Sequence, residues 1–327
     1  MRKKISMILL CILMVFIMAA CTKEQDTFSI DSRNTEISDE LEYTGTMELD
    51  YAEQFAVDYY EDGFSLVTTS DGSQYLVIPE GQNAPGDLPG DIVLLQQPVD
   101  NIYLVASAVM DMFVSMDALE TVGFSALDAD GWYIEAAKAA MESSDIKYAG
   151  KYSTPDYELI LERGCGLAIE NTMIYHTPEV KEQLEKFGIP VLVDYSSYEE
   201  NPLGRTEWIK LYGLLAGHED EAQAAFRSEK EAFESVSGAE PTGKTVAFFY
   251  ITSAGEANVR RPSDYLPKMI EMAGGEYIFT QSEDDTSTSS TMSMEMEEFY
   301  AQAKDADYII YNSTIAVSYT HLTLPTT

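Results

Sequence analysis

The feature that most constrains the fold is an alternation of apolar runs and capped helical patterns that starts near residue 100. The stretch STPDYELILERG at 153–164 has a serine or threonine suited to cap a helix, a proline in the first turn and a glycine just past the end. The apolar run CGLAIEN at 165–171 follows, and TPEVKEQLEKFG at 177–188 with IPVLVDY at 189–195 repeats the order. Such alternation predicts a parallel sheet with helices on its faces.

The alternation occurs in two blocks, which predicts two lobes. We assign residues 46–203 to an N-terminal lobe, residues 204–238 to a helical segment that includes an inter-lobe helix, and residues 239–315 to a C-terminal lobe. Residues 46–99 are a β-rich addition to the first lobe, because aspartate-glycine pairs between β-rich runs favour hairpins. The predicted fold is α/β: two Rossmann-like lobes with parallel sheets, a long connecting helix and this β-rich addition.

Residues 1–20 have the layout of a signal peptide, with a basic start, an apolar centre and small residues before the cut. The apolar part is short for a membrane-spanning helix, which needs about 20 residues. Cys21 follows Met-Ala-Ala, as in the lipobox of bacterial lipoproteins, so it is the expected site of lipidation. An ordinary leader with an incidental cysteine is the alternative. The polar residues 21–45 are then expected to form a flexible tether.

The composition restricts the partners. Without the leader the chain has 17 basic and 56 acidic residues, a formal charge of −39. This charge repels phosphate backbones and argues against nucleic acid as a partner. No basic cluster follows Cys21, so acyl chains would have to supply the membrane attachment. Cys165 is then the only cysteine left, which excludes an internal disulfide, and we expect it to be a small buried residue.

The second lobe is predicted to be incomplete. After the apolar run ADYIIYN at 306–312 the chain has only a short remainder. The stretch VSYTHLTLPTT at 317–327 resembles translated sequencing-adapter sequence, so we interpret residues 316–327 as a non-native tail. A genuine strand and tail is the alternative. An α/β lobe that stops at this point would leave a sheet edge exposed.

The lipobox, the polar tether and two α/β lobes joined by a long helix resemble the substrate-binding lipoproteins of ABC importers. Within these, the chain is similar to the type III periplasmic binding proteins, which bind ferric siderophores, haem or cobalamin. The resemblance covers about residues 46–315 and is carried by IYLVASAVMDMFVSMDAL, YAGKYSTPDYELILERGCGLAIEN, GIPVLV, GRTEWIKLYGLLAG and KMIEMAGG. The β-rich addition and the missing end of the second lobe depart from the family pattern.

The resemblance implies a monomeric binding protein, not an enzyme, on the outer side of a bacterial cell membrane. Its partners would be an ABC permease and its ATPase. We expect no catalytic residues, no resident cofactor and no metal site. A ferric siderophore, haem or cobalamin would be bound only as the transported ligand, in the cleft between the lobes.

The candidate ligand-binding residues lie mainly in loops after the predicted strands, because α/β proteins bind ligands at the carboxyl ends of parallel strands. They are Ser107, Asn171, Thr172, Tyr175 and His176, with Tyr195 and Tyr198, in the first lobe; Arg205 at the start of a helix; Arg260 and Arg261 in the second lobe; and Trp132, Tyr133 and Tyr152 as flat walls.

Each candidate has an alternative. The adjacent pair Arg260 and Arg261 suits anionic carboxylate or catecholate oxygens, or else neutralises nearby acids in solvent. Arg205 either faces the cleft or pairs with Glu207. The alternative for His176 is an ordinary loop histidine, and the alternative for the aromatic residues is packing in the core.

The resemblance also implies two docking positions. In the family, one acidic residue at the tip of each lobe contacts arginines of the permease. The matching residues are Glu158 in the first lobe and Glu297 or Glu298 in the second. Each lies near the start of a predicted helix, where a carboxylate also stabilises the helix dipole, so both interpretations stay open.

Other functional classes find less support. GAEPTGKT at 238–245 fits the phosphate-loop pattern, but a helix precedes it and a strand follows, the reverse of the order that directs backbone N–H groups at phosphate. The three histidines have no metal-ligand spacing. The rival hypotheses are a lipid-anchored hydrolase and a binding protein for a different solute. Against a hydrolase, this sequence has no G-x-S-x-G motif and few histidines that could act as a base.

Overall fold

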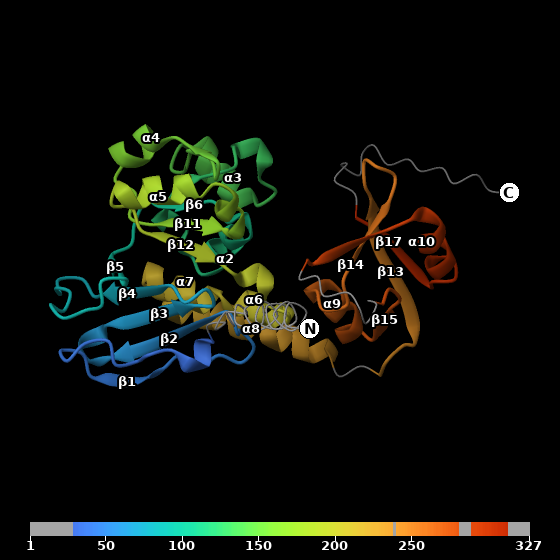
Figure 1. Cartoon of the computed structure of the whole chain (residues 1–327), viewed down its shortest axis with the longest axis horizontal. Helices are drawn as coiled ribbons and strands as arrows, with labels where there is room; N and C mark the ends of the chain where they lie inside the picture. The colour runs from blue at the N-terminus through green and yellow to red at the C-terminus, as the bar shows by residue number, and fades with distance from the viewer. Residues whose placement is uncertain (1–28, 238–239, 281–288, 313–327) are drawn as a thin grey trace, which may run out of the picture.

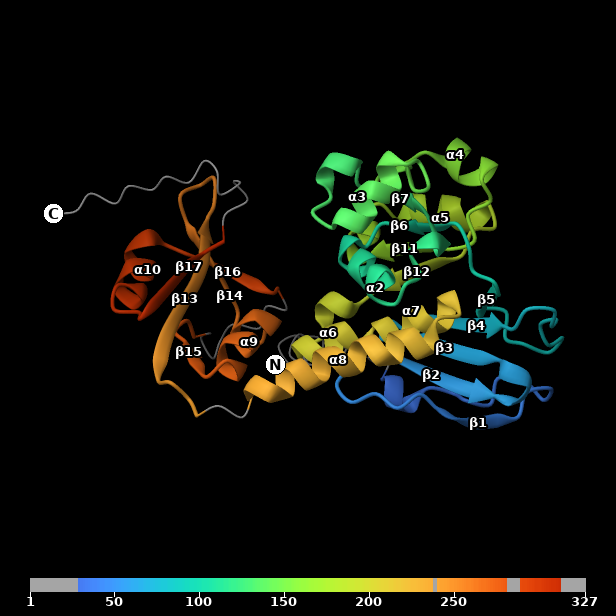
Figure 2. The ribbon, with the colours of Figure 1, turned by 180° about the vertical axis from the view of Figure 1, so that it is seen from behind.

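The computed structural model describes residues 29–237, 240–280 and 289–312. A β-rich sheet and the first lobe form one body, and the second lobe forms another (Figure 1). The helix α8 (Glu219–Ser237) runs under the first body and reaches the second, as the view from behind shows (Figure 2). Cys21, the predicted signal peptide and residues 316–327 lie outside the described residues. Within the described part of the chain, no helix is long and apolar enough to cross a bilayer.

The β-rich sheet has the strand order β1-β2-β3-β4-β5. Its strands are β1 (Tyr43–Thr46), β2 (Phe55–Tyr60), β3 (Ser65–Thr69), β4 (Gln74–Ile78) and β5 (Val93–Gln96). The pairs β2–β3 and β3–β4 are antiparallel and turn at Gly63 and Gly72, both with φ of +84°. The hairpins predicted at the two aspartate-glycine pairs are therefore confirmed.

The residues before this sheet are not a free tether in the described part. Ile37 is buried against the outer face of the sheet, in a cluster with Leu66 and Leu76. Arg33 donates to the carboxylate of Asp58 at 2.7 Å, and that carboxylate is fully buried. The prediction of a tether to residue 45 is thus wrong for residues 29–45, because this segment covers an apolar sheet face that would otherwise meet water.

The sheet of the first lobe is wholly parallel, with the strand order β12-β11-β6-β7-β8. Its strands are β6 (Ile102–Leu104), β7 (Val122–Ser125), β8 (Lys147–Tyr148), β11 (Ala168–Asn171) and β12 (Val191–Asp194). The helices α2 (Met110–Ser115), α3 (Glu135–Glu142), α4 (Tyr157–Glu162) and α5 (Pro178–Lys186) connect them. These bounds confirm the alternation that the sequence predicts.

The start of α4 differs from the expected cap. Thr154 and Pro155 form the short strand β10, which pairs with β9 (Gly150–Lys151). Asp156 caps the helix instead, since its carboxylate accepts from the backbone N–H of Leu159 at 3.1 Å. The predicted end is correct, because Gly164 takes a φ of +69° just past the last helical turn.

The helical segment divides into α6 (Pro202–Glu207), α7 (Ile209–Ala216) and α8. α7 is buried along nearly its whole length. It lies between the β-rich sheet and the parallel sheet (Figure 1). Trp208, at the junction of α6 and α7, packs against Phe55 of β2 with ring centroids 4.9 Å apart. One hydrophobic cluster therefore joins the β-rich sheet to the first lobe.

Two buried carboxylates reinforce this joint. Glu207 accepts hydrogen bonds from the backbone N–H groups of residues 50–52 and pairs with Lys210 at 2.6 Å. Glu199 accepts from the N–H groups of residues 53 and 54 and from the indole of Trp208. The option that Arg205 pairs with Glu207 is wrong, because Lys210 and the backbone occupy that carboxylate.

The second lobe has the strands β13 (Lys244–Ile251), β14 (Ala257–Arg260), β15 (Gly275–Tyr277), β16 (Thr291–Met294) and β17 (Tyr308–Tyr311), with the helices α9 (Tyr265–Met272) and α10 (Met296–Ala303). Its order is β15-β13-β14-β16, with β17 also paired to β13. β15 and β17 are parallel to β13, whereas β14 and β16 are antiparallel. The sheet is mixed rather than parallel throughout because β13 turns back into β14 through a tight turn at Gly255, with a φ of +85°.

Candidate functional site

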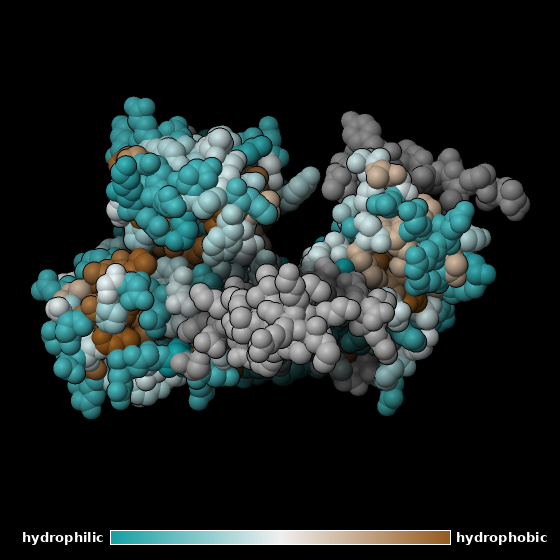
Figure 3. Space-filling view, viewed as in Figure 1, coloured by the Kyte–Doolittle hydropathy of each residue, from teal (hydrophilic) through white to brown (hydrophobic). Residues whose placement is uncertain are grey.

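The two bodies meet where α6 of the first lobe lies against α9 of the second. The guanidinium of Arg205 sits over the ring of Tyr265, 3.9 Å from its centroid. The space-filling view shows a gap between the upper parts of the two bodies, whose surface is mostly hydrophilic (Figure 3). The contact between Arg205 and Tyr265 thus connects the two lobes.

A cleft of about 780 Å³, which we call the arginine cleft, opens beside this contact. Its lining residues are Thr172, Ser197, Tyr198, Glu199, Glu200 and Arg205 from the first lobe and Arg260, Ser263, Asp264, Tyr265, Ser289 and Ser290 from the second. Both lobes therefore contribute walls, and a ligand bound there would touch both.

The first-lobe wall lies at the carboxyl ends of β11 and β12. Asn171 accepts from the backbone N–H of Met173 at 2.9 Å, which fixes the turn that carries Thr172. Asp194 accepts from the hydroxyls of Ser196 and Tyr212, and these bonds hold the turn that carries Tyr198. Burial raises the pKa of Asp194, while these hydrogen bonds oppose the shift.

The second-lobe wall is built around the end of β14. Arg260 contacts the carboxylate of Asp264 at 3.4 Å, and Asp264 also caps α9 by accepting from the N–H of Leu266. Tyr277 donates to the backbone carbonyl of Arg260 at 2.8 Å. Arg261 differs from its neighbour, because its side chain is 6% exposed and does not line the arginine cleft. Of the two arginines predicted to bind the ligand, Arg260 therefore lines the cleft and Arg261 is buried.

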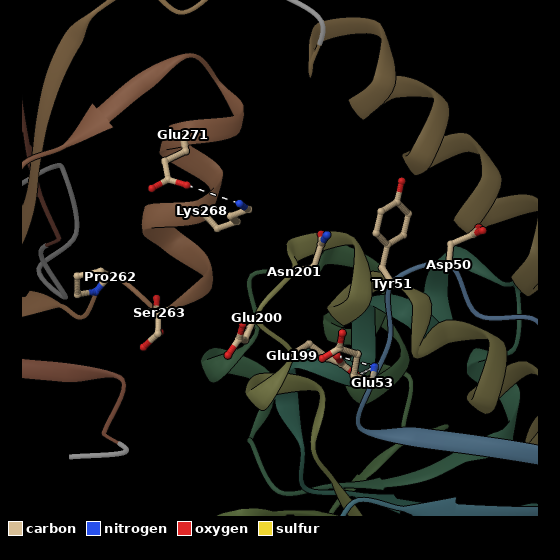
Figure 4. Close-up of a pocket in the computed structure, with 11 residues that line it drawn as sticks. Asp50, Tyr51, Glu53, Glu199, Glu200, Asn201, Pro262, Ser263, Lys268 and Glu271 are labelled. Atoms are coloured by element: carbon tan, nitrogen blue, oxygen red, sulfur yellow. Dashed lines mark hydrogen bonds and ion pairs between the residues drawn. The ribbon is translucent and has the colours of Figure 1, made fainter. Parts of the chain in front are cut away.

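A second hollow of about 410 Å³, the acidic pocket, adjoins the arginine cleft. Figure 4 shows Glu199 and Glu200 on one side and Lys268 with Glu271 on α9 on the other. It shares Glu199, Glu200, Ser263 and Asp264 with the arginine cleft. Burial raises the pKa of Glu199, and the backbone N–H groups and the indole that it binds oppose that shift.

The arginine cleft gathers four of the sequence candidates: Thr172, Tyr198, Arg205 and Arg260. The others do not line it. Ser107, His176 and Tyr133 are exposed elsewhere, and Tyr175 bonds through its hydroxyl to Tyr195 and Asp71. Asn171 accepts from the backbone N–H of Met173 and so holds the turn before the cleft, as described above. The placing of Trp132 and Tyr152 as cleft walls is wrong, because Trp132 is 7% exposed and donates to Ser125, and Tyr152 packs on the core of the first lobe.

Several lining residues were missed by the sequence analysis. Ser263 and Tyr265 stand at the start of α9, and Ser289 and Ser290 precede β16. Ser197 and Glu200 follow β12, so the rule about carboxyl ends of strands would have included them. The residues of the second lobe carry no comparable local signal, since antiparallel strands place them at the cleft.

The remaining sequence predictions concern single residues. Glu158, Glu297 and Glu298 are exposed in the first turns of α4 and α10, and their docking role stays a prediction. Cys165 is partly buried, and burial raises the pKa of its thiol to about 11, which keeps it protonated at neutral pH. Lys244 of the phosphate-loop match begins β13 and pairs with Asp307. The described ranges contain no cluster of three metal-ligating side chains.

No family model matches the chain. Two uncharacterized lipoproteins of Methanocaldococcus jannaschii, MJ0878 and MJ0872, are each 23% identical to it; they match 97% and 95% of this chain and 81% of their own length. Among solved structures, a periplasmic binding protein from Veillonella parvula matches with a TM-score of 0.54 and 14% identity over 68% of this chain and 73% of its own.

The periplasmic haem-binding protein HutB of Vibrio cholerae matches with a TM-score of 0.52 and 18% identity, over 64% of this chain and 75% of that protein. The chain has the two-lobe fold of the periplasmic binding proteins. At these identities the likeness is one of fold, which confirms the predicted α/β class. In this fold the arginine cleft lies between the two lobes.

Proposed function

We propose that this chain is the extracytoplasmic solute-binding component of an ABC importer, anchored to the cell membrane through a lipid on Cys21. The observation that carries the proposal is the arginine cleft, whose walls come from both lobes. The relatives named as lipoproteins and the solved neighbours named as periplasmic binding proteins support the location and the role. Capture without chemical turnover is the expected activity.

The proposed ligand is a ferric siderophore or a related iron or tetrapyrrole complex, which the permease and its ATPase would import. Support comes from the two arginines, one on each wall, because guanidinium groups bind anionic oxygens through paired N–H donors. The name of HutB, a haem-binding protein of the same fold, points to the same group of ligands. Glu158 and either Glu297 or Glu298 are the proposed contacts to the permease.

Titration of the purified chain with ferric siderophores, haem and cobalamin tests the proposal. Trp208 serves as the reporter, because its indole donates to Glu199, which lines the cleft, and the only other tryptophan, Trp132, is buried in the first lobe. We expect one-to-one binding at micromolar concentration or below, with the ligand recovered unchanged. Arg163→Ala, an exposed arginine at the end of α4, is the matched control and should bind as the unmodified chain does. Conversion of the ligand, or tight binding of an unrelated solute alone, would overturn the proposal.

A further inference from the structure

Every described residue that lines the arginine cleft has a polar or charged group in its side chain. Among the described residues the lining consists of seven hydroxyl side chains, two arginines and three carboxylates, with no aliphatic side chain. The rings of Tyr198 and Tyr265 are its main apolar surface, and the guanidinium of Arg205 already covers the ring of Tyr265. Sites for large apolar ligands are lined mainly by hydrophobic side chains, so this cleft does not suit a macrocycle with two apolar faces.

The two arginines have N–H groups available to a ligand, whereas two of the three carboxylates already accept hydrogen bonds from the protein. Within the described chain the guanidinium of Arg205 stacks on Tyr265 and makes no hydrogen bond. Arg260 has a single long contact, at 3.4 Å, with Asp264. Asp264 is occupied by this contact and by the α9 cap, and Glu199 by backbone N–H groups and Trp208. Glu200 is exposed and can turn to solvent.

We infer that the ligand is a hydrophilic, carboxylate-rich metal chelate of the ferric hydroxycarboxylate type, held between Arg205 and Arg260 and by the surrounding hydroxyl groups. This inference rests on the proposed function and narrows its ligand class. The forked guanidinium donors match carboxylate oxygens, and hydroxyl side chains can donate to the remaining oxygens or accept from ligand hydroxyls. A cleft of about 780 Å³ lies within the range of about 300–1,000 Å³ for small-molecule sites.

Tyr265 is the positioning residue in this arrangement. Its ring supports the Arg205 guanidinium from the opposite lobe, so both lobes contribute to the placement of one donor group. Tyr265→Phe keeps the ring and removes only one of the cleft hydroxyls, so it should weaken binding of the chelate less than Tyr265→Ala does. Tyr265→Ala removes the stacking surface and should weaken binding several-fold, because a cation–π contact contributes about 0.5–1 kcal/mol at exposed sites.

Calorimetric titration of the full chain with ferric citrate, haem and cyanocobalamin tests the inference. Ferric citrate should bind at least tenfold more tightly than the other two. Arg205→Ala and Arg260→Ala should each weaken it by about tenfold or more, since hydrogen bonds to charged groups contribute about 1.5–3 kcal/mol. Arg163→Ala should leave its affinity unchanged, and circular dichroism of each variant checks that the fold is retained.

The outcomes separate this inference from the proposed function. Haem or cyanocobalamin binding as tightly as ferric citrate, or more tightly, would overturn the hydrophilic ligand class and leave the proposed function standing. Unchanged affinity for ferric citrate in both arginine variants would overturn the placement between Arg205 and Arg260. If none of the ferric siderophores, ferric citrate, haem and cyanocobalamin binds, the proposed function fails and this inference fails with it.

Discussion

β12 and β17 invite comparison because both are four-residue strands of mainly apolar or aromatic residues at an edge of their sheets, and each pairs in parallel with one neighbour among the described strands. Their surroundings are opposite. The four residues of β12 are between 0 and 4% exposed, whereas the four residues of β17 are between 44 and 59% exposed. The same kind of strand is therefore interior in one lobe and solvent-exposed in the other.

The β-rich sheet and α7 account for the difference. Leu192 of β12 lies in the cluster that includes Val67 and Val77 of the β-rich sheet, and the hydroxyl of Tyr75 donates to the carbonyl of Val191 at 3.0 Å. On the second lobe, Phe249 of β13 packs between Phe299 of α10 and Tyr311 of β17. The described residues place no corresponding cover over the rest of β17. The β-rich sheet is thus part of the structural unit of the first lobe and protects its edge.

Matched truncations should give the largest contrast between the two strands. Leu192→Ala should lower the free energy of unfolding by about 2–5 kcal/mol, because it leaves a cavity in a closed core. Ile310→Ala should change it by about 0.5 kcal/mol or less, as exposed substitutions do. Urea unfolding followed by circular dichroism gives both values. Similar losses in the two variants would contradict the difference in packing.

A buried glutamate on β11 should make the stability of the first lobe depend on pH. Glu170 of β11 is fully buried, neither carboxylate oxygen has a hydrogen-bond partner among the described residues, and burial raises its pKa from 4.5 to about 8. The folded state therefore keeps a proton that the unfolded state loses above pH 4.5. Stability from this group is complete below pH 4.5 and is lost as the pH rises to about 8.

Glu170→Gln should remove this loss. The variant should match the unmodified chain near pH 4 and exceed it in urea midpoint near pH 8, because it cannot ionise. Glu80→Gln, at an exposed glutamate in the loop after β4, is the control and should follow the unmodified chain at every pH. A difference between Glu170→Gln and the unmodified chain that stays constant with pH would show that Glu170 does not titrate in this range.

The sequence could predict the features of this fold that depend on local signals, but not those that depend on contacts between distant segments. The strands and helices of the first lobe, its hairpins and the helix end at Gly164 follow from local signals, so they were predicted correctly. Arg205 and Arg260, which line the arginine cleft, could be proposed as ligand-binding residues because loops near strand ends and helix starts often carry sites in α/β folds, and their role stays a prediction. The packing of Ile37, the burial of Arg261 and the contact between Arg205 and Tyr265 depend on distant segments that meet only in the folded chain, and no local pattern encodes them.

The smallest expected effect tests whether the β-rich sheet and the first lobe unfold together. Tyr75→Phe removes the hydroxyl that donates to Val191 and leaves that carbonyl without this partner, which should lower stability by about 1–3 kcal/mol. Tyr133→Phe, at a residue that is 95% exposed, should have no measurable effect. Trp208 fluorescence reports on the joint between the sheet and α7, because this side chain packs against Phe55.

If the two parts form one unit, Tyr75→Phe should shift the transition seen by Trp208 fluorescence and the main transition seen by circular dichroism by the same amount, since a cooperative unit loses stability as a whole. Two separated transitions, with only one shifted by Tyr75→Phe, would mean that the β-rich sheet unfolds independently of the parallel sheet. The burial of β12 would then come from the docking of two separate domains, and its contrast with β17 would reflect that docking rather than a shared core.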